Sequence, residues 1–170
     1  SEAGFREIVL TGIHIASYGR DRQNTGNADL LDLLKDLHTI RGIERIRLGS
    51  LEPTLLTEHF IEEVRDLPKI CRHYHISLQS GCDATLKRMN RRYTTAEYRE
   101  IVRHLRCAIP EVAVTTDIMV GFPGETEEEF AATCAFAESV GFSRIHVFPY
   151  SPREGTPAAS FEHQVFPEIR

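Results

Sequence analysis

The amino-acid sequence predicts an α/β fold built on a parallel sheet of about five strands. Short apolar runs alternate along the chain with helical patterns, and no hairpin turn joins two of the runs. Strands separated by helices form βαβ units with right-handed crossovers, which make parallel sheets. A chain of 170 residues with 41% hydrophobic content can bury one full core, so residues 1–170 are expected to form a single domain.

The strands are expected at the apolar runs 6–13, 45–50, 74–80, 112–120 and 144–151. The helices are expected at 28–38, 57–67, 84–89 and 95–107, with a last helix that ends near residue 140. The capping boxes Thr94-x-x-Glu97 and Thr126-x-x-Glu129 mark the starts of the last two helices. Five β/α units are too few to close an eight-stranded barrel, so the sheet is either open and doubly wound or a partial, curved barrel.

Composition narrows the class of protein. The net charge of −5 gives no bulk electrostatic case for nucleic acid, although a local basic patch at residues 87–106 stays possible. No apolar run reaches the roughly 18 residues of a membrane span, so a cytoplasmic protein without membrane contact is expected. The four cysteines have no Cys-x-x-Cys spacing and are expected to be reduced, and the histidines show no ligand spacing, so no metal ligand is predicted.

Candidate site residues stand at the C-terminal ends of the predicted strands, where both fold types bind ligands. In "DIMVGFPGETEEEF" the carboxylate of Asp117 sits in an apolar strand, which is costly unless a partner or a ligand binds it, and a ligand is favoured. Gly121 and Gly124 give the following turn backbone freedom. Acidic residues crowd the next helix start and no Gly-Lys-Ser/Thr follows, which disfavours a phosphate and favours a ligand with cationic character.

The other strand ends are ambiguous on local chemistry alone. Gln79 and Ser80 either contact a ligand or cap the next helix. Glu52 is a weak signal by itself, and Arg91 belongs to a basic segment that is commonly a solvated helix end. Tyr150 begins a proline-rich segment that can be a rigid exit loop.

Four segments in this order, "LGSLEP", "HISLQSGCDATLKRMNRRYT", "DIMVGFPGETEEEF" and "HVFPYSPREGTPAA", resemble the core of radical S-adenosylmethionine (SAM) enzymes. Within that family they are similar to the methylthiotransferases that modify tRNA. "LTGIHIASYG" and "HVFPYSPREGTPAA" look most like the branch acting on N6-threonylcarbamoyladenosine (t6A) at position 37, rather than the isopentenyladenosine or ribosomal-protein branches. The resemblance implies a partial β/α barrel of the radical SAM type.

The resemblance also implies a SAM site and a role for each of its residues. The cofactor-binding residues would be Glu52, Gln79, Ser80, Arg91, Asp117, Gly121, Phe148 and Tyr150. Of these, Arg91 would pair with the SAM carboxylate and Asp117 would accept from the ribose hydroxyls, in keeping with the donors and acceptors that such groups need. Gly121 would let adenine approach, Phe148 and Tyr150 would form the other wall, and Glu52 with Gln79 would hold the ammonium region.

The sequence departs from the family in one respect. A radical SAM enzyme binds a [4Fe-4S] cluster through a Cys-x-x-x-Cys-x-x-Cys triplet, and none is present here. We therefore expect the cluster ligands and the first strand upstream of Ser1, no catalytic residue in this chain, and a separate N-terminal cluster-binding domain and C-terminal RNA-binding domain. The complete enzyme would methylthiolate t6A at C2, with tRNA, SAM and an electron donor as partners.

Two readings of another class stay open. A β/α-barrel lyase or aldolase would need a Schiff-base lysine at a strand end, and the lysines at positions 35, 69 and 87 fall on helices or loops, which counts against it. A non-catalytic module could bind RNA through residues 87–106, which carry seven Lys/Arg.

Overall fold

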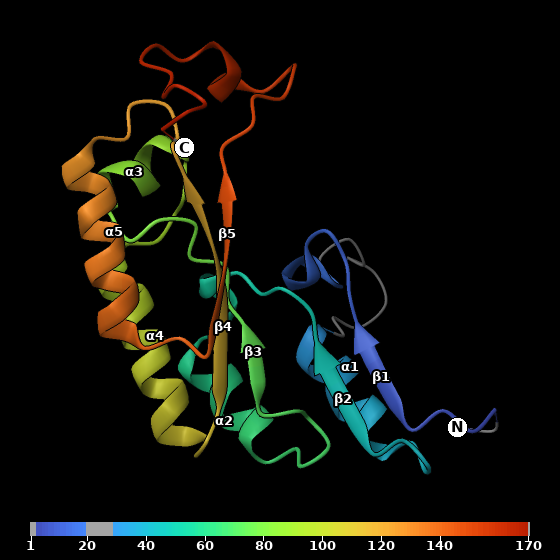
Figure 1. Ribbon diagram of the computed structural model, residues 1–170. Coiled ribbons are helices and arrows are strands. Elements are labelled where there is room, and N and C mark those ends of the chain that lie inside the picture. The colour runs from blue at the N-terminus through green and yellow to red at the C-terminus, as the bar shows by residue number, and fades with distance from the viewer. Residues whose placement is uncertain (1–2, 20–28, 170) are drawn as a thin grey trace. The chain divides into compact units, whose positions relative to one another are not determined.

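The computed structural model describes residues 3–19 and 29–169 of the chain (Figure 1). The predicted start of the first helix at residue 28 lies outside these ranges. The chain divides into two compact units, each built from two stretches of sequence. Unit 1 comprises Ser1–Ile76 and Ile101–Val114, and unit 2 comprises Ser77–Glu100 and Thr115–Arg170. Each unit is described by itself below.

Unit 1 combines two whole helices and part of a third with short parallel strands. Its elements are β1 (Glu7–Leu10), α1 (Leu30–Thr39), β2 (Arg45–Leu48), α2 (Glu58–Arg65), β3 (His73–His75), the second half of α4 (Thr95–Ala108) and the start of β4 (Ala113–Val120), with 3₁₀ turns at Ile15–Ser17 and Pro53–Leu55. Strands β1 and β2 pair in parallel, with Ile8 opposite Ile46. Isolated parallel bridges, Ile46 with Ile70 and Leu51 with Ile76, carry the pairing on toward β3.

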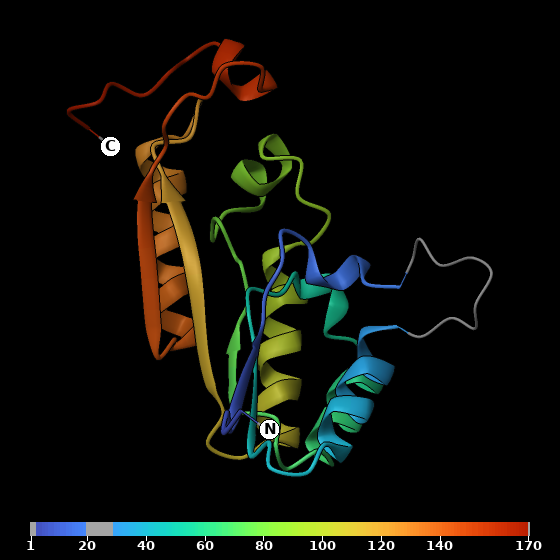
Figure 2. The same ribbon diagram turned by 90° about the vertical axis from the view of Figure 1, so that its right-hand side faces the viewer.

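Unit 2 contains a longer strand pair. Its elements are α3 (Asp83–Arg88), the first half of α4, most of β4, α5 (Glu127–Val140), β5 (Arg144–Pro149) and a 3₁₀ turn at Pro157–Ser160. Strands β4 and β5 pair in parallel over six residues, from Thr115 opposite Arg144 to Val120 opposite Pro149. Figures 1 and 2 show α5 lying along one face of this pair. That face is closed to solvent, because Thr116 and Ile118 of β4 are buried there.

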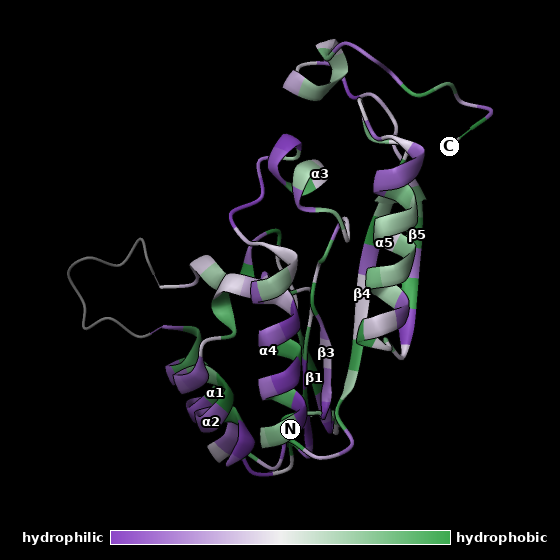
Figure 3. Cartoon of the chain, turned by 90° about the vertical axis from the view of Figure 1, so that its left-hand side faces the viewer, coloured by the Kyte–Doolittle hydropathy of each residue, from purple (hydrophilic) through white to green (hydrophobic). Residues whose placement is uncertain are grey.

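The helices form where local sequence provides caps and apolar spacing. Both predicted capping boxes are present: Glu97 and Thr94 exchange hydrogen bonds before α4, and Glu129 and Thr126 do so before α5. Helix α4 is amphipathic, as Figure 3 shows by its alternating polar and apolar residues. Its buried side chains, at helical spacing, are Tyr98, Val102 and Leu105. Gly141 ends α5 in the left-handed conformation with φ +64°, which favours glycine.

The predicted order of five parallel strands separated by helices is confirmed, but the ladder is not continuous. The strands form two sheets, β1-β2 and β3-β4-β5. The predicted strand 74–80 shortens to three residues because the Leu78 N–H donates to the Thr116 side chain at 3.0 Å instead of to a backbone carbonyl. Next to it, Gln79 has φ +72°, which no regular strand residue adopts.

The first predicted strand is also shorter than expected. Strand β1 ends at Leu10 instead of residue 13, and the chain then turns into the 3₁₀ turn Ile15–Ser17. In the part of the chain that the structure describes, no helix combines the length and the hydropathy that crossing a membrane requires.

Candidate functional site

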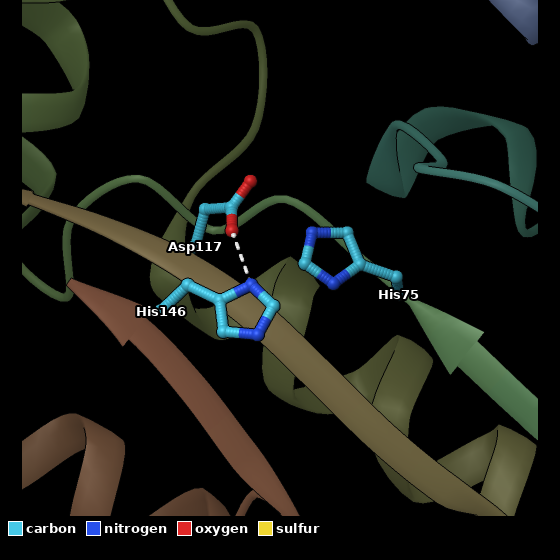
Figure 4. Close-up of side chains that lie close together, drawn as sticks. All are labelled: His75, Asp117 and His146. Atoms are coloured by element: carbon cyan, nitrogen blue, oxygen red, sulfur yellow. Dashed lines mark ion pairs between the residues drawn. The ribbon is translucent and has the colours of Figure 1, made fainter. Parts of the chain in front are cut away.

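Asp117 and His146 are opposite each other on the strand pair of unit 2. They are register partners in β4 and β5, and their side chains share one face of the sheet. The Tyr98 hydroxyl lies 3.5 Å from Thr116 Oγ1 on the helix-covered face, so by strand alternation Asp117 faces the other way. His146 Nδ1 lies 3.4 Å from Asp117 Oδ1 (Figure 4). The chain itself thus supplies a partner for the carboxylate that the sequence left unexplained.

Apolar surface continues beyond this pair on the same face. Phe148 lies two residues after His146 in β5, and 51% of it is exposed. Its register partner is Met119, which is half-buried. A carboxylate, an imidazole and an exposed aromatic ring therefore stand in a row toward the C-terminal ends of the two strands. Such a row suits a ligand that has both hydroxyl donors and a flat apolar part.

Gln79 is held in a strained backbone conformation beside this row. Its N–H donates to the Asp117 carbonyl at 2.8 Å, and its carbonyl accepts from the Met119 N–H at 2.9 Å. A non-glycine residue in the left-handed region costs about 1 to 3 kcal/mol. The two hydrogen bonds hold it there. Strain of this kind gathers at functional positions, so it supports the prediction that Gln79 belongs to a site.

Ser80 is fully buried, and its hydroxyl is used inside the fold. Its Oγ lies 3.1 Å from Thr133 Oγ1 on α5, and it accepts from the Cys82 N–H at 3.2 Å. Next to it, Gly81 fits tightly against α5, because a Cβ on it would lie 2.8 Å from both Thr133 Cα and Phe136 Cβ. The Ser80 hydroxyl thus links the loop to α5 and does not cap α3, whose N-cap Cys82 has no side-chain cap hydrogen bond. The need for glycine at position 81 was missed from sequence.

The Gly121 turn is closed by a carboxylate that the sequence analysis did not single out. The Gly121 N–H donates to Glu125 Oε2 at 2.5 Å, and burial raises the pKa of Glu125. Glu129, four residues further on, pairs with Arg88. Two of the acids that crowd the start of α5 therefore have partners inside the fold, which weakens the argument for a cationic ligand that rested on them. The spacing of four between Gly121 and Glu125 was the signal available in the sequence.

Tyr150 packs under the same turn. It is buried, and its N–H donates to the Val120 carbonyl at 2.8 Å. Its ring meets Phe122 edge to face at 5.3 Å between centroids, and Phe122 also contacts Phe161. These rings fix the turn that carries Gly121, so Tyr150 supports the site from below.

Arg91 follows α3 and is half-buried. Its N–H donates to the Leu86 carbonyl at 2.9 Å, which closes the end of that helix. Its Nε is buried, and no residue that the structure describes accepts a hydrogen bond from it. A buried guanidinium nitrogen without an acceptor is costly, so an anion supplied from outside the chain fits this position.

Glu52 lies in unit 1, whereas the other seven predicted site residues lie in unit 2. It precedes the 3₁₀ turn Pro53–Leu55, and its Oε2 lies 3.1 Å from His14 Nε2. Within unit 2, backbone hydrogen bonds and strand register bring Gln79, Asp117 and Phe148 onto adjoining strand segments.

The cysteines do not fit a cluster site in this chain. All four are free, at positions 71, 82, 107 and 134, and each lies on a different segment. Among residues 3–19 and 29–169, no group of side chains placed to share a metal ion includes a cysteine. This agrees with the absence of the three-cysteine motif from the sequence.

The comparison with protein families decides the class. A model of the radical SAM superfamily matches residues 2–137. The chain belongs to the radical SAM superfamily. SAM and a [4Fe-4S] cluster, the two cofactors expected from sequence, are the cofactors of this family.

A relative within the superfamily has a much higher sequence identity to this chain. This radical SAM chain is 46% identical over 169 residues to the threonylcarbamoyladenosine tRNA methylthiotransferase MtaB of Bacillus subtilis (strain 168). The match covers 99% of this chain and 37% of that protein. The chain therefore spans little more than a third of the length of the relative.

Solved radical SAM structures share the fold. The methyltransferase TsrM from Kitasatospora setae, with cobalamin and a [4Fe-4S] cluster bound, matches with a TM-score of 0.70 and 17% identity over 93% of this chain and 30% of that one. The oxidase HemN from Escherichia coli matches with a TM-score of 0.64 and 18% identity over 80% of this chain and 32% of that one. The predicted fold class, an α/β fold of the radical SAM type, is confirmed.

Proposed function

We propose that this radical SAM chain is the SAM-binding part of a methylthiotransferase that acts on t6A at position 37 of tRNA, at C2 of the adenine. The observation that carries the proposal is the 46% identity to MtaB along nearly the whole chain. The proposal includes tRNA and an electron donor as partners of the complete protein and the cytoplasm as its location. The t6A branch is also the one that the sequence motifs favoured.

The open face of unit 2 fits the polar and apolar parts of SAM. Asp117 presents a carboxylate toward the end of β4, and carboxylates suit a ribose diol because each oxygen accepts strongly. His146 at 3.4 Å would orient that carboxylate. The exposed ring of Phe148 offers a wall for the adenine, and Gly121, which has φ +69°, carries no side chain that could obstruct the base.

The amino-acid end of SAM carries a carboxylate and an ammonium group, so its site needs a cationic group for the first and acceptors for the second. Arg91 has a buried Nε without an acceptor among the described residues, and its planar fork would grip a carboxylate through two parallel bonds. Gln79 would receive the ammonium group. In the family, SAM bound at the cluster supplies the radical chemistry and the methyl group. The residues of this chain bind and orient it and exclude water.

A titration of SAM into the complete, cluster-loaded protein tests the site. Asp117→Asn keeps the size of the side chain and removes its charge, so SAM should bind about 1 to 2 kcal/mol more weakly. Arg91→Lys should weaken binding as well, because an ammonium cannot form the fork. The matched control is Asp36→Asn, a change at an exposed carboxylate of α1. Wild-type affinity in both site variants, with the cluster intact, would contradict the assignment.

The substrate is tested separately. A strain of the source organism that lacks the gene should accumulate t6A without its methylthio group, and a plasmid copy of the gene should restore that group, as mass spectrometry of digested tRNA would show. If instead the methylthio group disappears from isopentenyladenosine, the chain belongs to the other tRNA branch while the SAM site stands.

A further inference from the structure

Two carboxylates and an imidazole converge on the surface of unit 1, and none of the three belongs to the residues assigned above. Glu58 and Glu62 lie on α2, and His104 lies in the part of α4 that belongs to unit 1. One ligand atom of each side chain lies within 4.8 Å of those of the other two. His104 Nε2 is 4.0 Å from Glu58 Oε1.

Helix geometry explains why the two acids meet. Glu58 and Glu62 are four residues apart, so they lie on one face of α2, where like charges destabilise the helix unless a cation lies between them. Two nearby cations are engaged with other carboxylates. Lys35 binds Glu63 at 2.6 Å, and Arg65 binds Asp66 at 3.1 Å while its charge also acts on Glu62.

We propose that Glu58, Glu62 and His104 bind a divalent cation of the zinc class and thereby clasp α2 to α4. Imidazole nitrogen with carboxylate oxygens suits Zn²⁺, whereas Mg²⁺ and Ca²⁺ prefer oxygen ligands alone. Three protein ligands leave a fourth tetrahedral position for water. The site has no thiolate and is therefore distinct in chemistry from an iron-sulfur site.

The ligand atoms must move slightly closer together to bind zinc, and the exposed glutamate side chains allow this movement. Tetrahedral zinc ligands at about 2.0 to 2.1 Å from the metal lie roughly 3.4 Å apart, which is shorter than the 4.0 Å between His104 and Glu58. The Glu58 side chain is 78% exposed and can swing inward, while His104, at 27%, is held by packing. The imidazole thus provides the fixed ligand and the two glutamates close on it.

The test is a calorimetric titration of Zn²⁺ into the purified chain, with Co²⁺ absorbance as a second readout. We expect one Zn²⁺ bound by these ligands, a cobalt spectrum without thiolate charge-transfer bands, and a rise in the melting temperature with zinc. Glu62→Gln and His104→Ala should each weaken zinc binding by about tenfold or more, since even the loss of a supporting residue costs about 10 to 100-fold.

Matched controls lie on the same helix. Glu63→Gln and His59→Ala remove one acid and one imidazole of α2 that lie outside the group, so both should bind zinc like the wild type. The four cysteines stay in every variant, so zinc bound by thiols would appear equally in all of them. The Glu62 side chain is exposed, so Glu62→Gln leaves the packing of α2 unchanged. Unchanged zinc binding in Glu62→Gln, or equal losses in the controls, would overturn the proposal.

Discussion

Arg88 and Glu129 tie the short helix α3 to the first turn of α5 through a two-pronged ion pair. Arg88 Nη1 donates to Glu129 Oε1 at 3.0 Å, and Nη2 reaches Oε2. The arginine side chain also lies against the Gly121 turn, since a Cβ on Gly124 would be 3.5 Å from Arg88 Nε. Glu129 at the same time caps α5 through Thr126. The ion pair thus joins the start of α5 and the helix α3 to the turn of the proposed SAM site.

Replacing Glu129 by Gln isolates the ion pair from the cap. Glutamine at this position can still complete a capping box, but it leaves the partly buried Arg88 without its counter-charge. We expect the free energy of unfolding to fall by about 1 to 3 kcal/mol, as measured by urea denaturation at pH 7. Asp66→Asn, which breaks the exposed pair with Arg65, should cost about 0 to 1 kcal/mol. Equal effects of the two changes would mean that burial adds nothing to the Arg88 pair.

The same pair predicts a pH dependence. The hydrogen bond from Arg88 lowers the pKa of Glu129 below its ordinary value of 4.5. The unfolded chain then binds the proton more tightly than the folded one, so the stabilisation is complete above pH 4.5 and is lost as the pH falls through the lowered pKa. Urea midpoints measured from pH 7 down to pH 3 should therefore drop more steeply for the wild type than for Arg88→Gln. Parallel curves would show that the pair does not shift the glutamate.

Thr116 supports the break between β3 and the Gln79 segment. Its buried hydroxyl oxygen accepts from the Leu78 N–H at 3.0 Å. Thr116→Val keeps the shape but leaves that N–H without an acceptor, which should cost about 1 to 3 kcal/mol of unfolding free energy. Thr116→Ser, which keeps the acceptor, should recover part of the loss. A valine variant as stable as the wild type would show that water or another group replaces the hydroxyl.

Gly81 should tolerate no side chain. A Cβ there would lie 2.8 Å from Thr133 Cα, and backbone cannot move aside as a flexible side chain can. Gly81→Ala should destabilise by about 1 to 3 kcal/mol, measured by thermal or urea unfolding. Gly12→Ala is the control, because its Cβ would meet only Ile15 Cγ1 at 3.9 Å. If both alanine variants unfold alike, the packing of the Gly81 loop on α5 is looser than described.

Local signals in the sequence predicted the helices well, and contacts between distant residues set the rest. The capping boxes at Thr94 and Thr126 involve residues three apart, so the sequence alone was sufficient to find them. The end of β3 depends on Thr116, which is 38 residues from Leu78 in sequence, and nothing in the apolar run 74–80 indicates it. Hydrophobic periodicity therefore placed the strand but gave it the wrong length.

In the candidate site, too, local signals identified some residues and contacts between distant residues determined the others. Asp117 was identified because an acid in an apolar strand needs a partner, but its neighbour His146 follows only from the register of β4 against β5. Ser80 was chosen by resemblance, and its hydroxyl is bound by Thr133, which is 53 residues away. Residue type thus indicated where polar chemistry gathers, and register determined which groups face each other.

Helix α4 and strand β4 each begin in one compact unit and end in the other. The sequence of unit 1 is interrupted by residues 77–100, and it is complete only when residue 114 has been made. During synthesis, β1 to β3 therefore leave the ribosome before the second half of α4, and the core of unit 1 stays incomplete until that half emerges. Cutting the gene between the units would therefore yield two pieces that each lack part of their own core, so this fold has to be inherited and engineered as one piece.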